Sequence, residues 1–196
     1  MTAGDGGGRR AEVVVKAAAG GWRVAWRRYD QDARRRTAWG MLADLAGAHA
    51  PLINPCPRCG GPHGPVTLTG VPFVATVSYA AGYAVVALAD SARFQAVGVD
   101  AAAEPPASGA PPDFTGVLPE GSGLRDWVRV EAVVKADRRG LAVDPGRVSI
   151  RGDGRRWRAR IPGRMDRVRG VDLPGPPGVL VSLALIERSG SARERR

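Results

Sequence analysis

The chain has 196 residues, and 44% of them are hydrophobic, which is enough to fill the core of one large domain or two small ones. Its 29 Lys and Arg residues outnumber its 19 Asp and Glu residues, and since Lys16 and Lys135 are the only lysines, the net charge of +10 comes from arginine. Two cysteines are too few for a disulfide scaffold, and no apolar run reaches the ~20 residues of a membrane helix, so we expect a cytoplasmic protein without signal peptide or membrane contact.

The first third of the chain predicts two short strands followed by a helix. Residues 1–10 predict a disordered tail, and "AEVVVKAA" and "WRVAWRRY" predict strands joined at a Gly-Gly pair. Residues 30–50 predict a helix with arginines on one face and an apolar face formed by Ala33, Trp39, Leu42 and Leu45.

The middle of the chain predicts a loop, a hairpin and another strand. Gly and Pro residues in 54–65 exclude regular structure there. Residues 71–90 predict a hairpin of two buried strands that turns near Ala81 and Gly82, and 94–100 predict a strand that ends at Asp100.

The Pro-rich segment 105–120 predicts a linker between two halves. After it, the sequence predicts a helix that Gly140 ends, and then strands in "RVSIRG", "RWRARIP", "RVRGVDL" and "GVLVSLALI". Each half therefore has a helix followed by strands. We predict an α+β fold built as a pseudo-twofold pair of similar subdomains, at 11–104 and 121–188. Each subdomain is a small antiparallel sheet packed with a long helix. The last residues, 189–196, are predicted to form a polar tail.

The loop "CPRCGGPHG" allows three interpretations. Cys56, Cys59 and His63 have the spacing of zinc ligands, but a structural zinc site needs four ligands and only His49 remains to supply another. The second interpretation is an ordinary Gly/Pro-rich surface loop. The third is a loop whose glycines let its backbone approach a bound ligand.

Acidic and basic residues in the second half raise further alternatives. On a helix, Trp127, Glu131 and Lys135 share one face, so Glu131 and Lys135 form either a helical ion pair contributing ~0.3–0.5 kcal/mol or part of a functional site. Asp100, at a strand end, is a candidate Mg²⁺ ligand. The arginines around Trp157 suit nucleic acid, but the alternation in "RWRAR" favours a strand with its arginines facing water.

Taken in order, these segments resemble the Sfp-type 4′-phosphopantetheinyl transferases in the form found in high-GC bacteria. The resemblance spans residues 34–186, and four segments carry it: "ARRRTAWGMLADLAG", "CPRCGGPHGPVTL", "FVATVSYAAGYAVVALA" with "VGVDAAAE", and "WVRVEAVVKADRRGL". It implies transfer of phosphopantetheine from coenzyme A to a serine of an acidic apo carrier protein, with Mg²⁺. The linker between the halves favours a monomer, and we do not expect nucleic acid as a partner.

The resemblance also implies roles for individual residues. Asp100 and Glu131 match the metal ligands, and Glu131 and Lys135 match the catalytic pair, with Lys135 on the pyrophosphate. The implied coenzyme A contacts are Arg58, His63, Ser78, Tyr79 and Lys135, and Trp127 matches a packing residue.

The chain departs from the family pattern at several of these motifs. Ala102 stands where the family has a second acid, Val130 stands where it has a lysine, and Tyr79 replaces a histidine. These departures leave open an active transferase, a slow one, and a non-catalytic relative that binds coenzyme A or a carrier protein.

Overall fold

The computed structural model describes residues 13–16, 20–47, 50–110, 112–152 and 154–188, so the predicted tails at 1–10 and 189–196 lie outside the described residues. The fold is α+β, as predicted, with antiparallel sheets and two α-helices in the described part of the chain. None of these helices is long and apolar enough to cross a membrane.

The first sheet has the strand order β1-β2-β6-β5. Its members are β1 (Val13–Lys16), β2 (Trp22–Arg28), β5 (Phe73–Ala80) and β6 (Tyr83–Asp90). The hairpin β5–β6 turns at Ala81 and Gly82 as predicted, and both residues have positive φ angles, 47° and 76°. A separate short pair, β3 (Leu52–Ile53) and β4 (Thr67–Leu68), encloses the Gly/Pro-rich loop.

The second sheet has the strand order β7-β11-β10-β9-β8. Its members are β7 (Phe94–Ala103), β8 (Ser149–Arg151), β9 (Arg156–Arg160), β10 (Val168–Leu173) and β11 (Val179–Glu187). The alternation in "RWRAR" has the predicted effect, because Trp157 and Ala159 are buried while the arginines of β9 face water. β7 precedes the predicted linker in sequence, yet it pairs with β11, the last strand.

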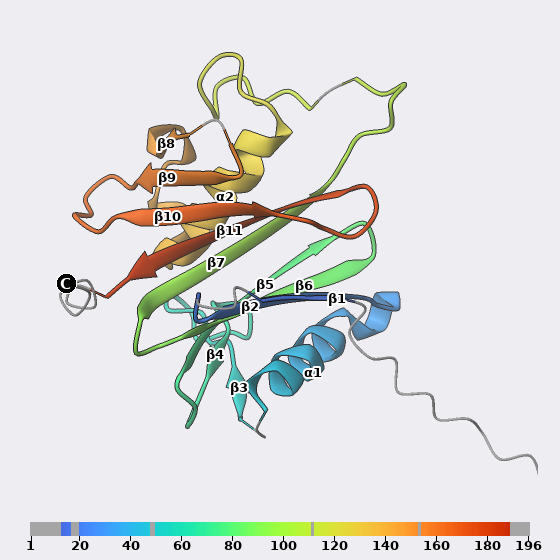
Figure 1. Cartoon of the computed structure of the whole chain (residues 1–196), viewed down its shortest axis with the longest axis vertical. Coiled ribbons are helices and arrows are strands. Elements are labelled where there is room, and N and C mark those ends of the chain that lie inside the picture. The colour runs from blue at the N-terminus through green and yellow to red at the C-terminus, as the bar shows by residue number, and fades with distance from the viewer. Residues whose placement is uncertain (1–12, 17–19, 48–49, 111, 153, 189–196) are drawn as a thin grey trace, which may run out of the picture.

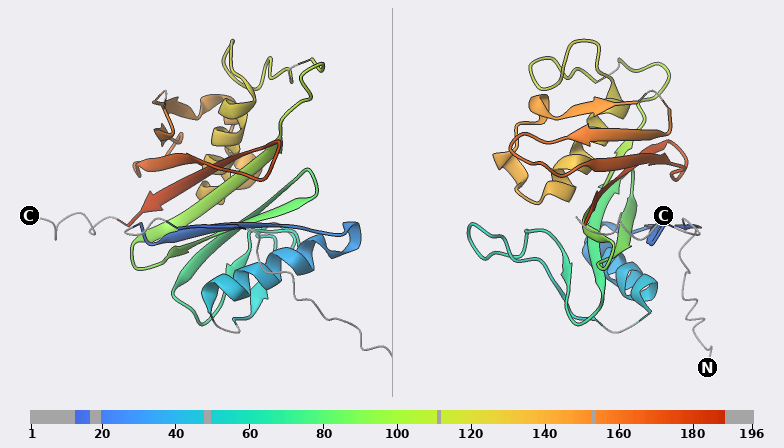
Figure 2. Two further views of the ribbon diagram at one scale, coloured as in Figure 1. Left: turned by 45° about the vertical axis from the view of Figure 1, so that its right-hand side comes forward. Right: turned by 60° about the vertical axis from the view of Figure 1, so that its left-hand side comes forward.

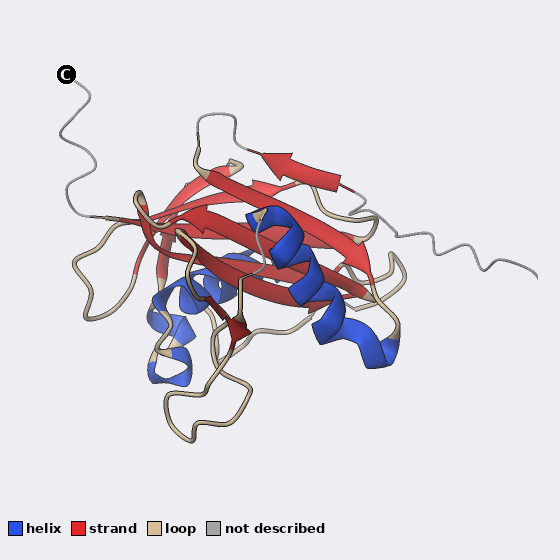
Figure 3. Ribbon diagram, turned by 90° about the horizontal axis from the view of Figure 1, so that it is seen from below, coloured by secondary structure: helices blue, strands red, loops and turns tan. Residues whose placement is uncertain are grey.

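One helix covers the outer face of each sheet (Figures 1 and 2). α1 (Arg34–Ala46) follows a short 3₁₀ turn (Gln31–Ala33) and lies across the first sheet, as Figure 3 shows from below. α2 (Leu124–Asp137) packs on the second sheet and is followed by 3₁₀ turns at Gly140–Ala142 and Pro145–Arg147. α2 ends before Gly140, the predicted stop, because Arg138 already adopts a left-handed conformation with φ 64°.

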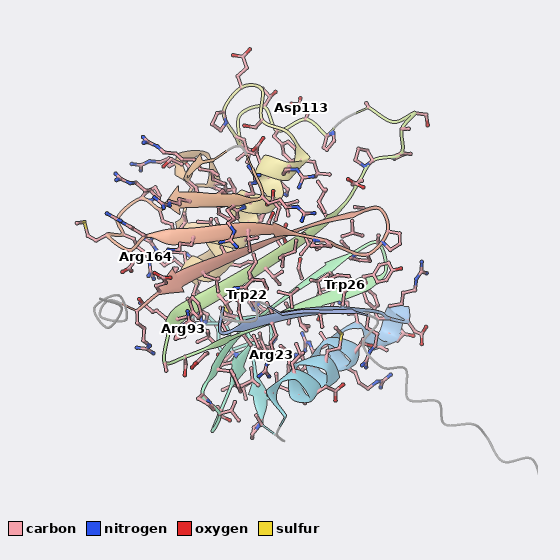
Figure 4. All side chains as sticks on the ribbon, viewed as in Figure 1. Trp22, Arg23, Trp26, Arg93, Asp113 and Arg164 are labelled. Carbon is pink, nitrogen blue, oxygen red and sulfur yellow. The ribbon has the colours of Figure 1, made fainter. Side chains whose placement is uncertain are left out.

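The inner faces of the two sheets pack against each other to form the central core. Period-two alternation on β2 directs Trp22 and Trp26 into this core and Arg23 toward α1, where its guanidinium donates to the Leu45 carbonyl at 2.5 Å (Figure 4). The molecule is therefore layered as helix, sheet, sheet and helix.

Candidate functional site

The two sheets are joined where the edge strands β5 and β7 meet, and side chains make the connection. The Ser78 hydroxyl donates to Asp100 Oδ1 at 2.9 Å and accepts from the Ala101 N–H at 3.2 Å. Two residues earlier on each strand, Thr76 Oγ1 accepts from the Val99 N–H at 3.4 Å. Ser78 and Asp100 are both buried, so this junction fixes Asp100 between the two halves.

Lys135 of α2 completes this junction. Its Nζ donates to Asp100 Oδ1 at 2.6 Å and to Ser78 Oγ at 3.0 Å. Among the described residues, Asp100 is the ion-pair partner of Lys135, so the interpretation of Glu131 and Lys135 as an ordinary helical ion pair is wrong. The lysine reaches across to β7 instead of along its own helix.

A glycine lets α2 approach β7 closely enough for this contact. A Cβ atom on Gly98 would lie 2.0 Å from the Ala132 carbonyl oxygen and 2.4 Å from the Ala136 nitrogen, which no side chain could tolerate. Since Gly98 precedes Asp100 by two residues on the same strand, its lack of a side chain brings Lys135 within reach of Asp100.

Glu131 lies one helical turn before Lys135 and is partly buried. Burial raises the pKa of its carboxyl group, the nearby Asp100 raises it further, and Lys135 opposes both effects. Within the described part of the chain, the Glu131 carboxylate makes no hydrogen bond or ion pair. Its oxygens therefore remain available as hydrogen-bond acceptors.

Trp127, one turn earlier still, is partly buried, as its position on this face predicts. Its ring stacks on Phe114 with centroids 5.4 Å apart and an interplanar angle of 16°. Phe114 belongs to the predicted linker 105–120, so this contact attaches the segment to α2.

Two adjoining cavities open beside this junction. The smaller has a volume of about 460 Å³, and its walls include Ser78, Asp100, Ala102 and Trp127. The larger has a volume of about 790 Å³, and its walls include Arg58 and His63. Their shared walls are formed by Arg34, Val77, Tyr79, Glu131 and Lys135. Every site residue proposed from the sequence lines at least one cavity.

The larger cavity is also lined by arginines that the sequence reasoning did not single out: Arg34 and Arg35 at the start of α1, and Arg138 and Arg139 just after α2. All four are exposed. The signal was present as two arginine runs at helix boundaries. Arg139 is paired with Asp137, and the other guanidinium groups add positive charge and hydrogen-bond donors of the kind that suit phosphate or carboxylate.

Tyr79, which stands where the transferases that the sequence resembles have a histidine, lies between these arginines and the junction. The Arg34 guanidinium lies over its ring at 5.4 Å, and the Tyr29 ring contacts it edge-on at 5.7 Å. Burial raises the pKa of the Tyr79 hydroxyl, and the charges of Arg34 and Arg35 only partly offset this effect. At neutral pH Tyr79 is therefore a neutral hydrogen-bond donor and carries no charge.

Asp100 and Glu131 are the residues that would hold the magnesium ion that the resemblance implies. Asp100 and Glu131 both face the smaller cavity, and the proximity of Asp100 raises the pKa of Glu131. A divalent cation would relieve this repulsion, and Mg²⁺ is commonly held by two protein carboxylates, with phosphate and water completing its shell. Ala102 lines the same cavity and supplies no ligand.

Another buried carboxylate, two strands away from Asp100 in the same sheet, lines neither cavity. Asp172 of β10 is 6% exposed and accepts hydrogen bonds from three buried groups: Arg129 Nη2 at 2.7 Å, Trp157 Nε1 at 2.9 Å and Ser182 Oγ at 2.8 Å. Burial alone would raise the pKa of Asp172, but these hydrogen bonds outweigh it and lower the pKa.

Comparison with known proteins assigns no family to this chain: no protein-family model matches it, and no curated protein matches it at a significant level.

Proposed function

We propose that this protein transfers the 4′-phosphopantetheine group from coenzyme A to a serine of an apo acyl or peptidyl carrier protein. The observation that supports this function best is the convergence of Asp100, Glu131 and Lys135, from β7 and α2, in one cavity that adjoins a larger arginine-lined one. The same convergence is what the resemblance to the Sfp-type transferases leads one to expect.

The proposed reaction is a phosphoryl transfer in which positioning and electrostatics lower the barrier. The serine oxygen of the carrier forms a bond to the phosphorus that bears pantetheine, and the bond from that phosphorus to the bridging oxygen breaks. Adenosine 3′,5′-bisphosphate leaves. The serine proton passes to the Glu131 carboxylate, which lines the same cavity.

The remaining groups hold the pyrophosphate. Lys135 supplies a positive charge and Tyr79 supplies a hydroxyl donor on the same wall, where Ser78 can donate to phosphate once its hydroxyl turns away from Asp100. Mg²⁺ held by Asp100 and Glu131 would neutralise negative charge on the pyrophosphate. Because Tyr79 carries no charge where the family has a histidine, we expect more of the phosphate binding to depend on the neighbouring Arg34.

Coenzyme A would occupy the larger cavity, whose arginines suit its phosphates and whose wall carries Arg58 and His63. In this proposal the two sheet-and-helix halves are related by a pseudo-twofold axis with the cofactor between them. The partner is an acidic carrier protein, which the net charge of +10 would attract. We propose that the enzyme acts as a cytoplasmic monomer.

A non-catalytic relative that binds coenzyme A or a carrier protein is the second candidate. One contact favours it: Lys135 Nζ lies 2.6 Å from Asp100 Oδ1, so one proposed catalytic residue neutralises a proposed metal ligand. Ala102 adds no carboxylate to replace it.

Intact-protein mass spectrometry of an apo carrier incubated with this protein, coenzyme A and Mg²⁺ separates the two candidates. We expect a mass gain of one phosphopantetheine group, and we expect Asp100→Ala and Glu131→Ala to abolish it. Calorimetric binding of coenzyme A with no mass gain on several carriers would support the non-catalytic relative. Full transfer by both variants would refute the assignment of the site.

A further inference from the structure

The loop between β3 and β4 brings three metal-ligating side chains together. Cys56, Cys59 and His63 each offer one ligand atom, and these atoms all lie within 4.8 Å of one another. Cys59 Sγ and His63 Nε2 are 3.1 Å apart. Around one zinc ion, bonded to sulfur at about 2.3 Å and to nitrogen at about 2.0 Å, tetrahedral ligand atoms lie about 3.5–3.8 Å from each other. The three side chains therefore need only small movements to share one ion.

The backbone of the loop holds this arrangement in place. The Gly60 N–H donates to the Cys56 carbonyl at 2.8 Å, and the Cys56 N–H donates to the Gly61 carbonyl at 2.8 Å. Gly60 has a φ of 71°, which reverses the chain directly after the second cysteine.

The closing end of the loop is equally constrained. A Cβ atom on Gly64 would lie 2.0 Å from the Pro55 carbonyl oxygen, so only glycine allows the two ends to cross this closely. The Pro62 carbonyl accepts from Arg35 Nη2 of α1 and from Asn54 Nδ2, both at 2.8 Å. The loop is thus folded on itself and attached to α1 next to the histidine.

We propose that Cys56, Cys59 and His63 bind one Zn²⁺ ion, with the fourth position open to solvent. Two thiolates and a neutral imidazole balance the charge of a divalent ion, and this softer ligand set suits zinc and not magnesium. Three protein ligands with an open position are a common zinc arrangement. Cys56 and His63 line the larger cavity, and Arg58 stands between the cysteines, so the metal would stiffen that wall of the cavity.

The test is the metal content of the full-length protein, purified reduced through a tag that contains no histidine. We expect one equivalent of zinc by mass spectrometry of the metal, and thiolate-to-cobalt charge-transfer absorption after replacement by Co²⁺. Cys56→Ser and Cys59→Ser should each weaken zinc binding by more than about 100-fold. Loss of a residue that only supports a ligand weakens metal binding by at most about 100-fold, so a larger loss identifies a direct ligand. Circular dichroism shows whether each variant is folded.

Arg58→Ser is the matched control, because it changes the same loop between the two cysteines and removes no ligand. It should keep the full zinc content. His49→Ala should also keep zinc, since His49 is the only other histidine or cysteine in the sequence, and loss of zinc there would contradict the open fourth position. The proposal is overturned if reduced protein takes up neither Zn²⁺ nor Co²⁺, if Cys59→Ser retains zinc, or if Cys56 and Cys59 form a disulfide under reducing purification.

Discussion

Two buried carboxylates, Asp100 of β7 and Asp172 of β10, both stand opposite Ser182 of β11, and they differ in what surrounds them. Asp172 is bound by Arg129, Trp157 and Ser182, and it lines neither of the two cavities. Asp100 also has partners, but it opens to a cavity and lies near Glu131, whose carboxylate has no hydrogen-bond partner in the described part of the chain. Groups of the protein supply the hydrogen-bond donors of Asp172. Asp100 instead lies beside Glu131, whose oxygens remain available as hydrogen-bond acceptors.

The pKa directions express the same contrast. Hydrogen bonds lower the pKa of Asp172, so its charge stabilises the fold above about pH 4 and this stabilisation is lost as the pH falls. Burial and Asp100 raise the pKa of Glu131, so its charge is unfavourable in the folded state. A protein retains an unfavourable buried charge where that charge has a function. The comparison therefore favours a structural role for Asp172 and supports the functional role proposed for the Asp100 cluster, which consists of Asp100, Glu131 and Lys135.

The largest expected effect is on stability and comes from Asp172→Ala. Removing this carboxylate leaves Arg129 buried without its main partner, so we expect the free energy of unfolding to fall by about 3–5 kcal/mol. Chemical denaturation measures the loss. Asp44→Ala, which removes the exposed partner of Arg27, is the control and should cost less than about 1 kcal/mol. Equal losses in the two variants would contradict the structural role of Asp172.

Lys135→Met should lower the transfer rate strongly and the stability only moderately. It keeps the apolar stem of a side chain that is 31% exposed and removes the charge. Asp100 loses this partner but keeps the hydrogen bond from Ser78, so the unfolding free energy should fall by about 1–3 kcal/mol, less than for Asp172→Ala. The transfer rate should fall by about 10²–10³-fold, the usual loss when one donor to a developing charge is removed. A stability loss as large as that of Asp172→Ala, with transfer unchanged, would make Lys135 structural.

A smaller effect is expected from Arg34→Ala, because Arg34 lines both cavities but is exposed. The KM for coenzyme A should rise by about tenfold with little change in kcat, as loss of one charge-assisted hydrogen bond predicts. Steady-state kinetics measure both constants. Arg36→Ala, the neighbouring exposed arginine that lines neither cavity, should leave them unchanged; equal effects would indicate a general influence of net charge.

The smallest effect is a gain of stability in Glu131→Gln. The folded-state pKa of Glu131 is raised above the reference value of 4.5, so the native glutamate loses stability as the pH rises through that raised pKa. Glutamine does not ionise. The melting temperature of the variant should therefore exceed that of the native protein at pH 7–8, and the difference should shrink as the pH approaches 4.5. A difference independent of pH would show that the carboxylate is not destabilising.

Local patterns predicted the elements well, and they failed at contacts between distant segments. The hairpin turn at Ala81 and Gly82, the strand alternation around Trp157 and the helix carrying Glu131 follow from residue type and period. The pairing of β7 with β11 has no local signature, since it joins residues about eighty positions apart in the sequence. The predicted linker at 105–120, between those strands, stays a prediction.

The candidate site shows the same limit. Asp100, Glu131 and Lys135 were chosen by their resemblance to a motif, but spacing alone favoured a pair of Glu131 with Lys135, and the structure pairs Lys135 with Asp100. The cavity arginines were missed because an arginine run beside a helix usually marks a solvated surface. Only the tertiary arrangement shows that the runs at α1 and α2 converge.

The most direct test of the account is the transfer rate of Asp100→Asn, measured beside the native protein in samples whose melting temperatures are also recorded. The substitution keeps the size of the side chain and its hydrogen bond with Ser78, and it removes the charge. We predict a rate lower by about 10²–10³-fold with a melting temperature within a few degrees of the native value. A native rate, or a stability loss as large as that of Asp172→Ala, would contradict the functional role of the Asp100 cluster.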